Sequence, residues 1–196
     1  MGRNIEFNKQ EVQNKAMNLF WKKGYESTSL SDLLTEMRLS KSSFYQTFQS
    51  KHILFESCLS YYAKSLIEDI VFEYKESLNS FLFFEKFLND IANNTQSEIG
   101  QKGCLLMNTA TEFSQRDILL SKIVDQSLKK IETTFIKIIM KGQFENNLSK
   151  TISPETLAPF LMTIICGLKS RSKAGVSKNI LLTTVNITLE LIQEKN

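Results

Sequence analysis

Apolar residues recur at the spacing of an α-helix along almost the whole chain, and no segment alternates apolar and polar residues as a strand would. Near the N-terminus, Val12, Ala16, Leu19 and Phe20 follow one another at intervals that place them on one helical face. This periodicity predicts an all-α protein of about nine helices. A small N-terminal three-helix unit is expected to continue into a larger C-terminal helical bundle.

Capping residues and glycines divide this pattern into separate helices. Asn8 is placed to begin the first helix in a capping box, and Gly24 is placed to end it. Ser50 is placed to cap a much longer fourth helix. We therefore predict two domains, residues 1–50 and residues 51–196.

The excess positive charge lies entirely in the first quarter of the chain. The formal net charge is +3, and residues 1–52 contain eight Lys or Arg against five Asp or Glu, whereas the remaining residues contain sixteen of each. A local excess of this kind is what an anion-binding end requires. The alternative is a chance excess of three charges.

Composition disfavours several functions. A single histidine, with no Gly-rich phosphate loop and no nucleophile motif, gives little basis for an enzyme, a metal site or another cofactor. The longest nearly apolar run, residues 157–168, is shorter than the about 20 residues that cross a bilayer. We expect a cytoplasmic protein without cofactors, in which the three cysteines, Cys58, Cys104 and Cys166, are reduced thiols.

The stretch LSKSSFYQTFQSKHIL, residues 39–54, sets many polar residues around a few apolar ones. A short amphipathic helix over residues 29–37 precedes it, and a tight turn separates the two. At about 100° per residue, Phe44 and Phe48 lie on the inner face of the second short helix. The pattern is that of a helix-turn-helix unit, whose second helix enters the major groove of DNA.

Opposite this apolar stripe, Ser42 and Gln46 face outward, toward base edges in such a complex. A glutamine amide can pair with adenine, and serine is a permissive reader. Contacts to the DNA backbone are expected from Lys41, Tyr45, Thr47 and Lys51. The alternative is that these polar side chains form an ordinary solvated surface.

The run GYESTSLSDLLTEMRLSKSSFYQTFQSKHIL, residues 24–54, resembles the DNA-binding segment of the TetR family of bacterial transcriptional regulators. The matching positions are Gly24, Tyr25, Thr28, Ser29, Ser40, Lys41, Tyr45, Phe48, Ser50 and Lys51. By this resemblance Thr28, Tyr45 and Lys51 contact phosphates and the helix from Ser40 to Thr47 reads bases. The implied DNA-binding set is Thr28, Ser29, Ser40, Lys41, Ser42, Ser43, Tyr45, Gln46, Thr47 and Lys51.

Two positions depart from the family pattern. The turn usually holds an Ala-Gly pair, but here Met37 and Arg38 occupy it, so we expect a non-glycine residue at positive φ. The acid that commonly follows the second lysine is replaced by His52, which is expected to lie at the surface and to loosen the cap of the fourth helix.

The resemblance also implies an effector pocket and a homodimer in the larger domain. The expected pocket residues are Tyr62, Phe81, Phe84, Phe87, Cys104, Met107, Thr111 and Phe113. The expected dimer-interface residues are Leu161, Ile164, Ile165, Leu168, Leu181, Val185 and Leu189. Aromatic residues at helical spacing also fill ordinary cores, and that alternative stays open for the pocket set. Cys104 begins a helix after Gly103, so it is either a reactive sensor or a packing residue.

These features together predict a ligand-responsive regulator that binds double-stranded operator DNA as a homodimer. We expect a repressor that a small apolar or aromatic effector releases from a palindromic operator. The alternative from another class is a helical protein that binds small molecules or lipids and has no DNA function.

Overall fold

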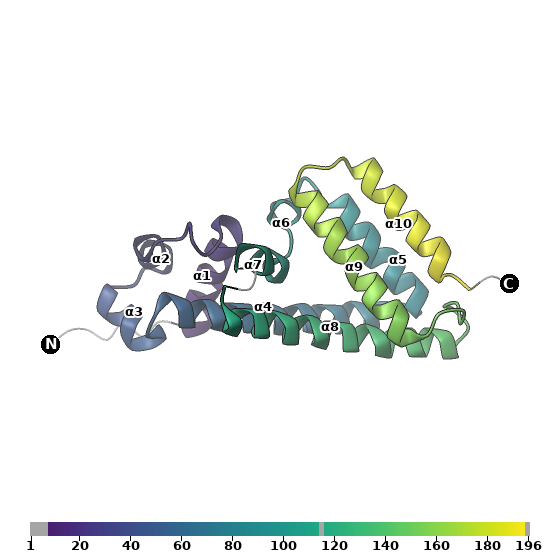
Figure 1. Ribbon diagram of the computed structural model, residues 1–196, viewed down its shortest axis with the longest axis horizontal. Coiled ribbons are helices and arrows are strands. Elements are labelled where there is room, and N and C mark those ends of the chain that lie inside the picture. Colours follow the sequence, from purple (N-terminus) through teal and green to yellow (C-terminus); the bar gives the residue numbers. More distant parts are fainter. Residues whose placement is uncertain (1–7, 114–115, 195–196) are drawn as a thin grey trace.

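The computed structural model describes residues 8–113 and 116–194, which form ten helices and no strand beyond one isolated bridge between Leu148 and Gln193 (Figure 1). The helices are α1 (Lys9–Lys23), α2 (Leu30–Met37), α3 (Lys41–Phe48), α4 (Lys51–Glu76), α5 (Ser80–Asn93), α6 (Glu98–Lys102), α7 (Leu105–Phe113), α8 (Ile118–Phe144), α9 (Pro154–Lys173) and α10 (Lys178–Ile192). The predicted all-α class is confirmed. The five-residue α6 adds one helix to the nine expected.

Two long helices connect the two ends of the molecule. In Figure 1, α1, α2 and α3 gather at one end, α5, α9 and α10 gather at the other, and α4 and α8 run side by side between them. Helix α4 packs against both α1 and α8, so one helix belongs to both ends. Within the described residues, no helix is long and apolar enough to cross a membrane.

The N-terminal end, which we call the head (residues 8–50), contributes buried apolar residues to a core that continues into the larger bundle. Phe44 and Phe48 of α3 are buried, as is Leu33 of α2. Phe20 of α1 packs edge-on against Phe55 of α4, with ring centroids 4.9 Å apart. Contacts between α1 and α4 therefore fasten the head to the rest of the chain.

The turn between α2 and α3 adopts the conformation expected of it. Arg38 takes a left-handed conformation with φ 54°, and its backbone N–H donates to the carbonyls of Leu34 and Thr35. This confirms that a non-glycine residue adopts positive φ here, a conformation that favours glycine. Ser40 then caps α3, because its hydroxyl accepts the backbone N–H of Ser43 at 3.1 Å.

Helix α4 begins with an intact cap. The Ser50 hydroxyl accepts the backbone N–H of Ile53 at 3.1 Å, so the expected loosening by His52 is wrong. The helix then continues unbroken for 26 residues. At 1.5 Å per residue its length is about 39 Å, which carries it from the head into the centre of the larger bundle.

Candidate nucleic-acid interface and effector cavity

Helix α3 presents a polar face to solvent above a buried aromatic stripe. Phe44 and Phe48 are buried, while Ser42 and Gln46 are exposed, as the helical spacing predicted. The side chain of Tyr45 is 45% exposed, with its ring edge-on to Phe44 at 5.4 Å between centroids. The buried stripe fixes the rotation of α3, and these three side chains are then available to a partner.

The other polar residues of this segment differ in exposure and in whether their side chains already have hydrogen-bond partners. Lys41 is exposed at the start of α3. The hydroxyl of Thr47 donates to the Ser43 carbonyl at 2.8 Å, and both residues are only partly exposed. Ser29 is exposed, but its hydroxyl is engaged in a capping box with Asp32 at 2.8 Å. Ser29 and Thr47 therefore act first in closing helical turns.

The predicted phosphate contact at Thr28 is wrong for this conformation. The residue is 0% exposed, and its hydroxyl donates to the Gly24 carbonyl at 2.6 Å. The side chain folds back to close the loop that follows α1. Thr28 therefore stabilises the entry to α2 and presents no atom to a phosphate.

Lys51 is held above an aromatic cluster at the base of the head. Its ammonium nitrogen lies 4.1 Å from the centroid of the Tyr25 ring, close enough for a cation–π contact. The Tyr25 ring in turn packs against Phe55 at 4.9 Å and Phe113 at 5.2 Å. Because Phe113 belongs to α7, the cluster joins the head to the larger bundle.

A carboxylate of the larger bundle binds the backbone of the head. Glu112 of α7 accepts the backbone N–H of Tyr25 at 3.0 Å and that of Glu26 at 2.7 Å. Gly24 leaves room for this contact, since a Cβ at that position would lie 3.2 Å from the Glu112 carboxylate.

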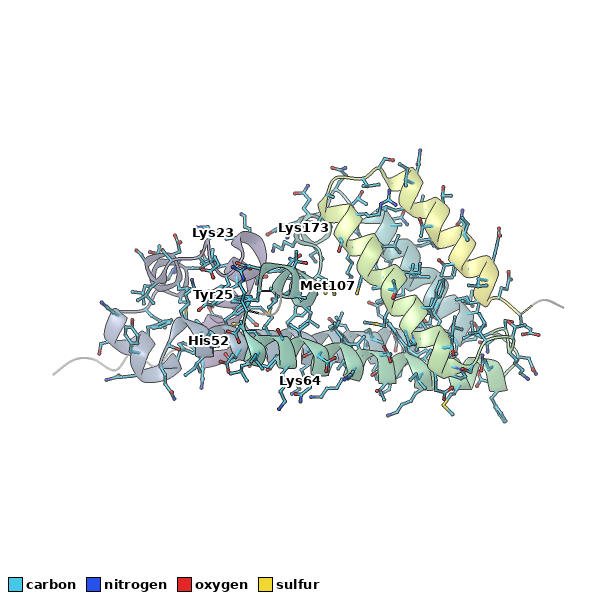
Figure 2. The ribbon with its side chains drawn as sticks, in the orientation of Figure 1. Lys23, Tyr25, His52, Lys64, Met107 and Lys173 are labelled. Carbon is cyan, nitrogen blue, oxygen red and sulfur yellow. The ribbon has the colours of Figure 1, made fainter. Side chains whose placement is uncertain are left out.

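His52, in the first turn of α4 just after the head, links that helix to the start of α8. Its Nε2 lies 2.7 Å from Asp117 of the larger bundle, and its Nδ1 lies 2.6 Å from Glu56. The hydrogen bond with Asp117, together with Glu56, raises the pKa of His52 against a smaller opposing effect of burial. The same hydrogen bond and the backbone N–H of Leu120 lower the pKa of Asp117. We call Tyr25, Glu26, His52, Glu112 and Asp117 the joint; Figure 2 labels Tyr25 and His52.

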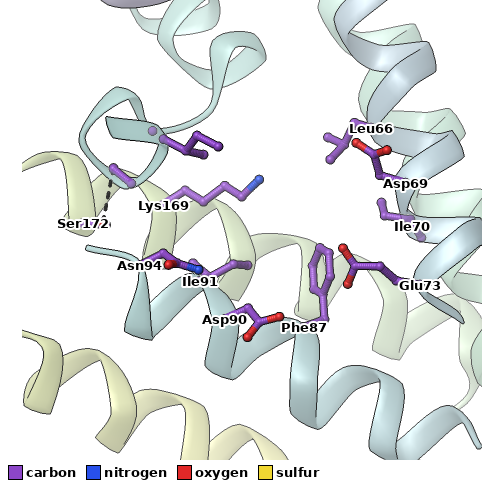
Figure 3. A pocket seen from close by; sticks show the side chains of 13 residues that line it. Leu66, Asp69, Ile70, Glu73, Phe87, Asp90, Ile91, Asn94, Lys169 and Ser172 are labelled. Carbon is purple, nitrogen blue, oxygen red and sulfur yellow. Dashed lines mark hydrogen bonds between the residues drawn. The ribbon is translucent and has the colours of Figure 1, made fainter. Parts of the chain in front are cut away.

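A cavity of about 290 Å³ opens in the larger bundle between α4, α5 and α9 (Figure 3). It is lined by Leu66, Asp69, Ile70, Glu73, Phe87, Asp90, Ile91, Asn94, Ile99, Gly100, Gly103, Lys169 and Ser172. The Ser172 hydroxyl donates to the Gly100 carbonyl at 3.2 Å and fastens α6 to α9 at the rim. An adjoining apolar space of about 20 Å³ shares Leu66, Ile70, Phe87 and Lys169 with this cavity and reaches Cys104 and Cys166.

Most of the predicted pocket residues lie elsewhere. Phe87 lines both spaces and Cys104 lines the smaller one, but the others line neither: Tyr62, Phe81, Phe84, Met107, Thr111 and Phe113. Phe84 is fully buried against Phe135, and Tyr62 packs edge-on against Trp21 of the head at 5.0 Å. The aromatic residues of this set and Met107 pack in the core or against the head, so the pocket prediction is wrong for them, whereas Thr111 is exposed and lines a separate cavity of about 420 Å³ between α1, α7 and α9. The acidic lining was not predicted.

The cysteines lie inside the larger bundle. Cys104 is 6% exposed just before α7, and the Tyr62 hydroxyl lies 3.9 Å from its sulfur. Burial raises the pKa of Cys166 to about 11 and that of Cys58 to about 12. Packing is therefore a role that all three thiols fulfil, and reactivity of Cys104 stays a prediction.

The predicted dimer residues point into the core of their own subunit and not toward a second copy. Ile164 is partly buried, and the others are buried within the subunit: Leu161, Ile165, Leu168, Leu181, Val185 and Leu189. Their stripe is the inner face of α9 and α10, which packs on α8 and α5. The outer faces carry exposed apolar residues instead, namely Phe160, Ile180, Ile187 and Leu191. A side chain at Gly167 of α9 would meet nothing within 4 Å.

Comparison with known proteins gives consistent matches along the chain. The family described as "Bacterial regulatory proteins, tetR family" matches residues 14–58, and the one described as "Tetracyclin repressor-like, C-terminal domain" matches residues 84–182. The HTH-type transcriptional repressor ComR of Escherichia coli K12 is 28% identical over 98% of this chain and 92% of its own.

Solved structures share the fold along nearly the full length. The reduced form of NemR from E. coli has a TM-score of 0.86 at 17% identity, covering 95% of this chain and 97% of its own. A cysteine mutant of the TetR family transcriptional regulator CifR, complexed with 26-bp double-strand operator DNA, has a TM-score of 0.74 at 25% identity. That match covers 96% of this chain and 98% of CifR.

Proposed function

The chain belongs to the TetR family of bacterial transcriptional regulators, and from this premise we propose that it is a homodimeric repressor which a small-molecule effector releases from operator DNA. The observation that carries the proposal is the exposed polar face of α3 above its buried phenylalanines. A helix exposed in this way on a compact head fits the major groove.

Within this proposal, Gln46 and Ser42 read base edges, and Tyr45 with Lys41 and Lys51 fix the helix on the DNA backbone. Among these five side chains, only Gln46 has an amide, the group that pairs bidentately with adenine. The backbone N–H groups at the start of α3 add a phosphate site, since a helix N-terminus attracts anions. Thr28 is left out of the set because its hydroxyl is bonded internally.

The homodimer is proposed to form through the outer faces of α9 and α10. These faces carry Phe160, Ile180, Ile187 and Leu191, and the bare backbone at Gly167 permits close approach of a second helix. Two-fold pairing of two such helices makes a four-helix interface. It would set two copies of α3 about 34–36 Å apart, as a palindromic operator requires.

Effector release is proposed to act through α4. The same helix carries His52 at the joint and Leu66, Asp69, Ile70 and Glu73 in the wall of the cavity. An effector that binds one position of α4 more tightly than another shifts the orientation of the head. The free energy by which the effector weakens DNA binding cannot exceed the difference between its binding free energies for the two positions of α4.

The proposal is tested by fluorescence anisotropy with DNA that flanks the gene of this protein, at two salt concentrations. We expect binding that weakens with salt and a loss of about tenfold or more in affinity for Gln46→Ala. Gln126→Ala, on the exposed surface of α8, is the matched control and should bind normally. Equal binding of flanking and random DNA by the wild type would contradict the regulator function and favour a purely ligand-binding role.

A further inference from the structure

The cavity between α4, α5 and α9 combines an apolar wall with an acidic one. Leu66, Ile70 and Ile91 supply aliphatic surface, and Phe87 supplies an aromatic ring. The carboxylates come from Asp69 and Glu73 on α4 and from Asp90 on α5. In Figure 3 the ring of Phe87 stands between the side chains of Glu73 and Asp90.

The positive groups near the cavity do not balance these carboxylates. Lys86 lies 2.7 Å from Asp90 and 3.5 Å from Glu73, so one ammonium serves two acids. Among the described residues, no lysine or arginine lies within ion-pair distance of Asp69. Lys169 projects from the opposite wall, on α9 (Figure 3). Three carboxylates therefore lie near two ammonium groups, and the excess negative charge lies on the wall formed by α4.

We propose that the effector is an organic amine whose ammonium lies against Asp69 and Glu73 and whose apolar body packs on Phe87, Ile70 and Leu66. This rests on the proposed function and specifies the effector of the same site. An ammonium near a carboxylate forms a charge-assisted hydrogen bond, and near the face of an aromatic ring it gains a cation–π contact. The cavity offers both kinds of contact beside an apolar surface.

The size and charge of the cavity limit the ligand further. A volume of about 290 Å³ lies at the small end of ligand sites, so one ring or a short branched chain fits. An organic anion would find only the ammonium of Lys169 in the lining, against three carboxylates, because Lys86 is not part of the lining and already pairs with Asp90 and Glu73. A bare metal ion would leave the apolar wall unused. The amine class is therefore the one that uses both walls.

Two of the contacting residues lie on the helix that leads to the head. Asp69 and Glu73 are one helical turn apart on α4, which begins at the joint with His52. An ammonium drawn to this wall pulls directly on α4. Differential binding at Asp69 and Glu73 is thus coupled to the orientation of the head without an intermediate element.

The test compares three probes that share a phenyl ring and differ in charge: 2-phenylethylammonium, 3-phenylpropanoate and 2-phenylethanol. Binding to the full-length protein is measured by isothermal titration calorimetry. We expect the amine to bind about tenfold or more tightly than the other two, and this preference to be lost in the Asp69→Asn, Glu73→Gln double variant. Glu68→Gln, at an exposed neighbouring position of α4, should keep the preference.

Three calorimetric outcomes would overturn the inference: tighter binding of the propanoate, equal binding of the amine by the double variant, or no binding of the amine at millimolar concentration. A DNA-binding measurement separates this inference from the proposed function. The double variant should bind operator DNA normally and no longer respond to the amine. If the wild type binds the amine but no operator, the regulator proposal fails while the ligand class stands.

Discussion

Replacing Glu112 with alanine should loosen the head from the larger bundle. The carboxylate accepts the backbone N–H of Tyr25 at 3.0 Å and that of Glu26 at 2.7 Å. A hydrogen bond to a charged group contributes roughly 1.5–3 kcal/mol when the freed partner stays buried. The Glu26 N–H is exposed and regains water, whereas the Tyr25 N–H is partly buried. We expect the free energy of unfolding in urea to fall by about 2–3 kcal/mol.

Two controls make this expectation specific. Glu112→Gln keeps one acceptor oxygen and should lose about half as much stability. Glu68→Ala removes only an exposed pair with Lys64, and should change stability by less than about 0.5 kcal/mol. Loosening of the loop should also speed trypsin cleavage after Lys23 in the native state. A Glu112→Ala protein with the stability and cleavage rate of the wild type would refute the role of the carboxylate.

Three further perturbations probe other parts of the molecule. The pKa of His52 in the folded state is raised above its ordinary value of 6.5, so its link to two carboxylates stabilises the fold fully below about pH 6.5. This stabilisation is lost as the pH rises through the folded-state pKa. In urea unfolding, His52→Ala should therefore lower the free energy of unfolding less at pH 9 than at pH 6. Ile187→Glu, at a side chain 63% exposed, should give a folded monomer in size-exclusion chromatography with light scattering, and an intact dimer would exclude this face. With pKa values raised to about 12 and about 11, Cys58 and Cys166 should react slowly with a thiol reagent at pH 7, so any fast phase that Cys104→Ala removes would identify Cys104 as the reactive thiol.

The local features of the head could be predicted from sequence because they depend on neighbouring residues. Helical spacing alone determines that Phe44 and Phe48 share one face and that Gln46 lies on the other. The positive φ of Arg38 follows from a tight turn that lacks glycine. Thr28 was mispredicted because its hydroxyl binds the Gly24 carbonyl one turn back instead of facing a DNA phosphate, and the local sequence does not distinguish these two partners.

The dimer face and the cavity of the larger bundle could not be predicted from sequence, because they depend on tertiary contacts that no local pattern reveals. An apolar stripe such as that of Leu181 and Val185 fits equally against a helix of the same chain or of a second copy. Buried and cavity-lining phenylalanines, such as Phe84 and Phe87, likewise share the same spacing. The pairing of His52 with a residue 65 positions away has no sequence signal, although the departure from the family pattern at position 52 marked it as unusual.

The joint limits how this protein can be recombined with others. A chimera cut at residue 50 would carry Tyr25 and Glu26 to a new sensor while leaving behind Glu112, the carboxylate that accepts their backbone N–H groups; His52 and Asp117 lie on the same side of the cut and would stay paired. The Tyr25 and Glu26 N–H groups of a transplanted head would then face whatever residue the host supplies at the position of Glu112. An interchangeable head therefore comprises residues 1–50 together with one acceptor from the other half of the chain, Glu112, and a designer of biosensors must move the two as one unit.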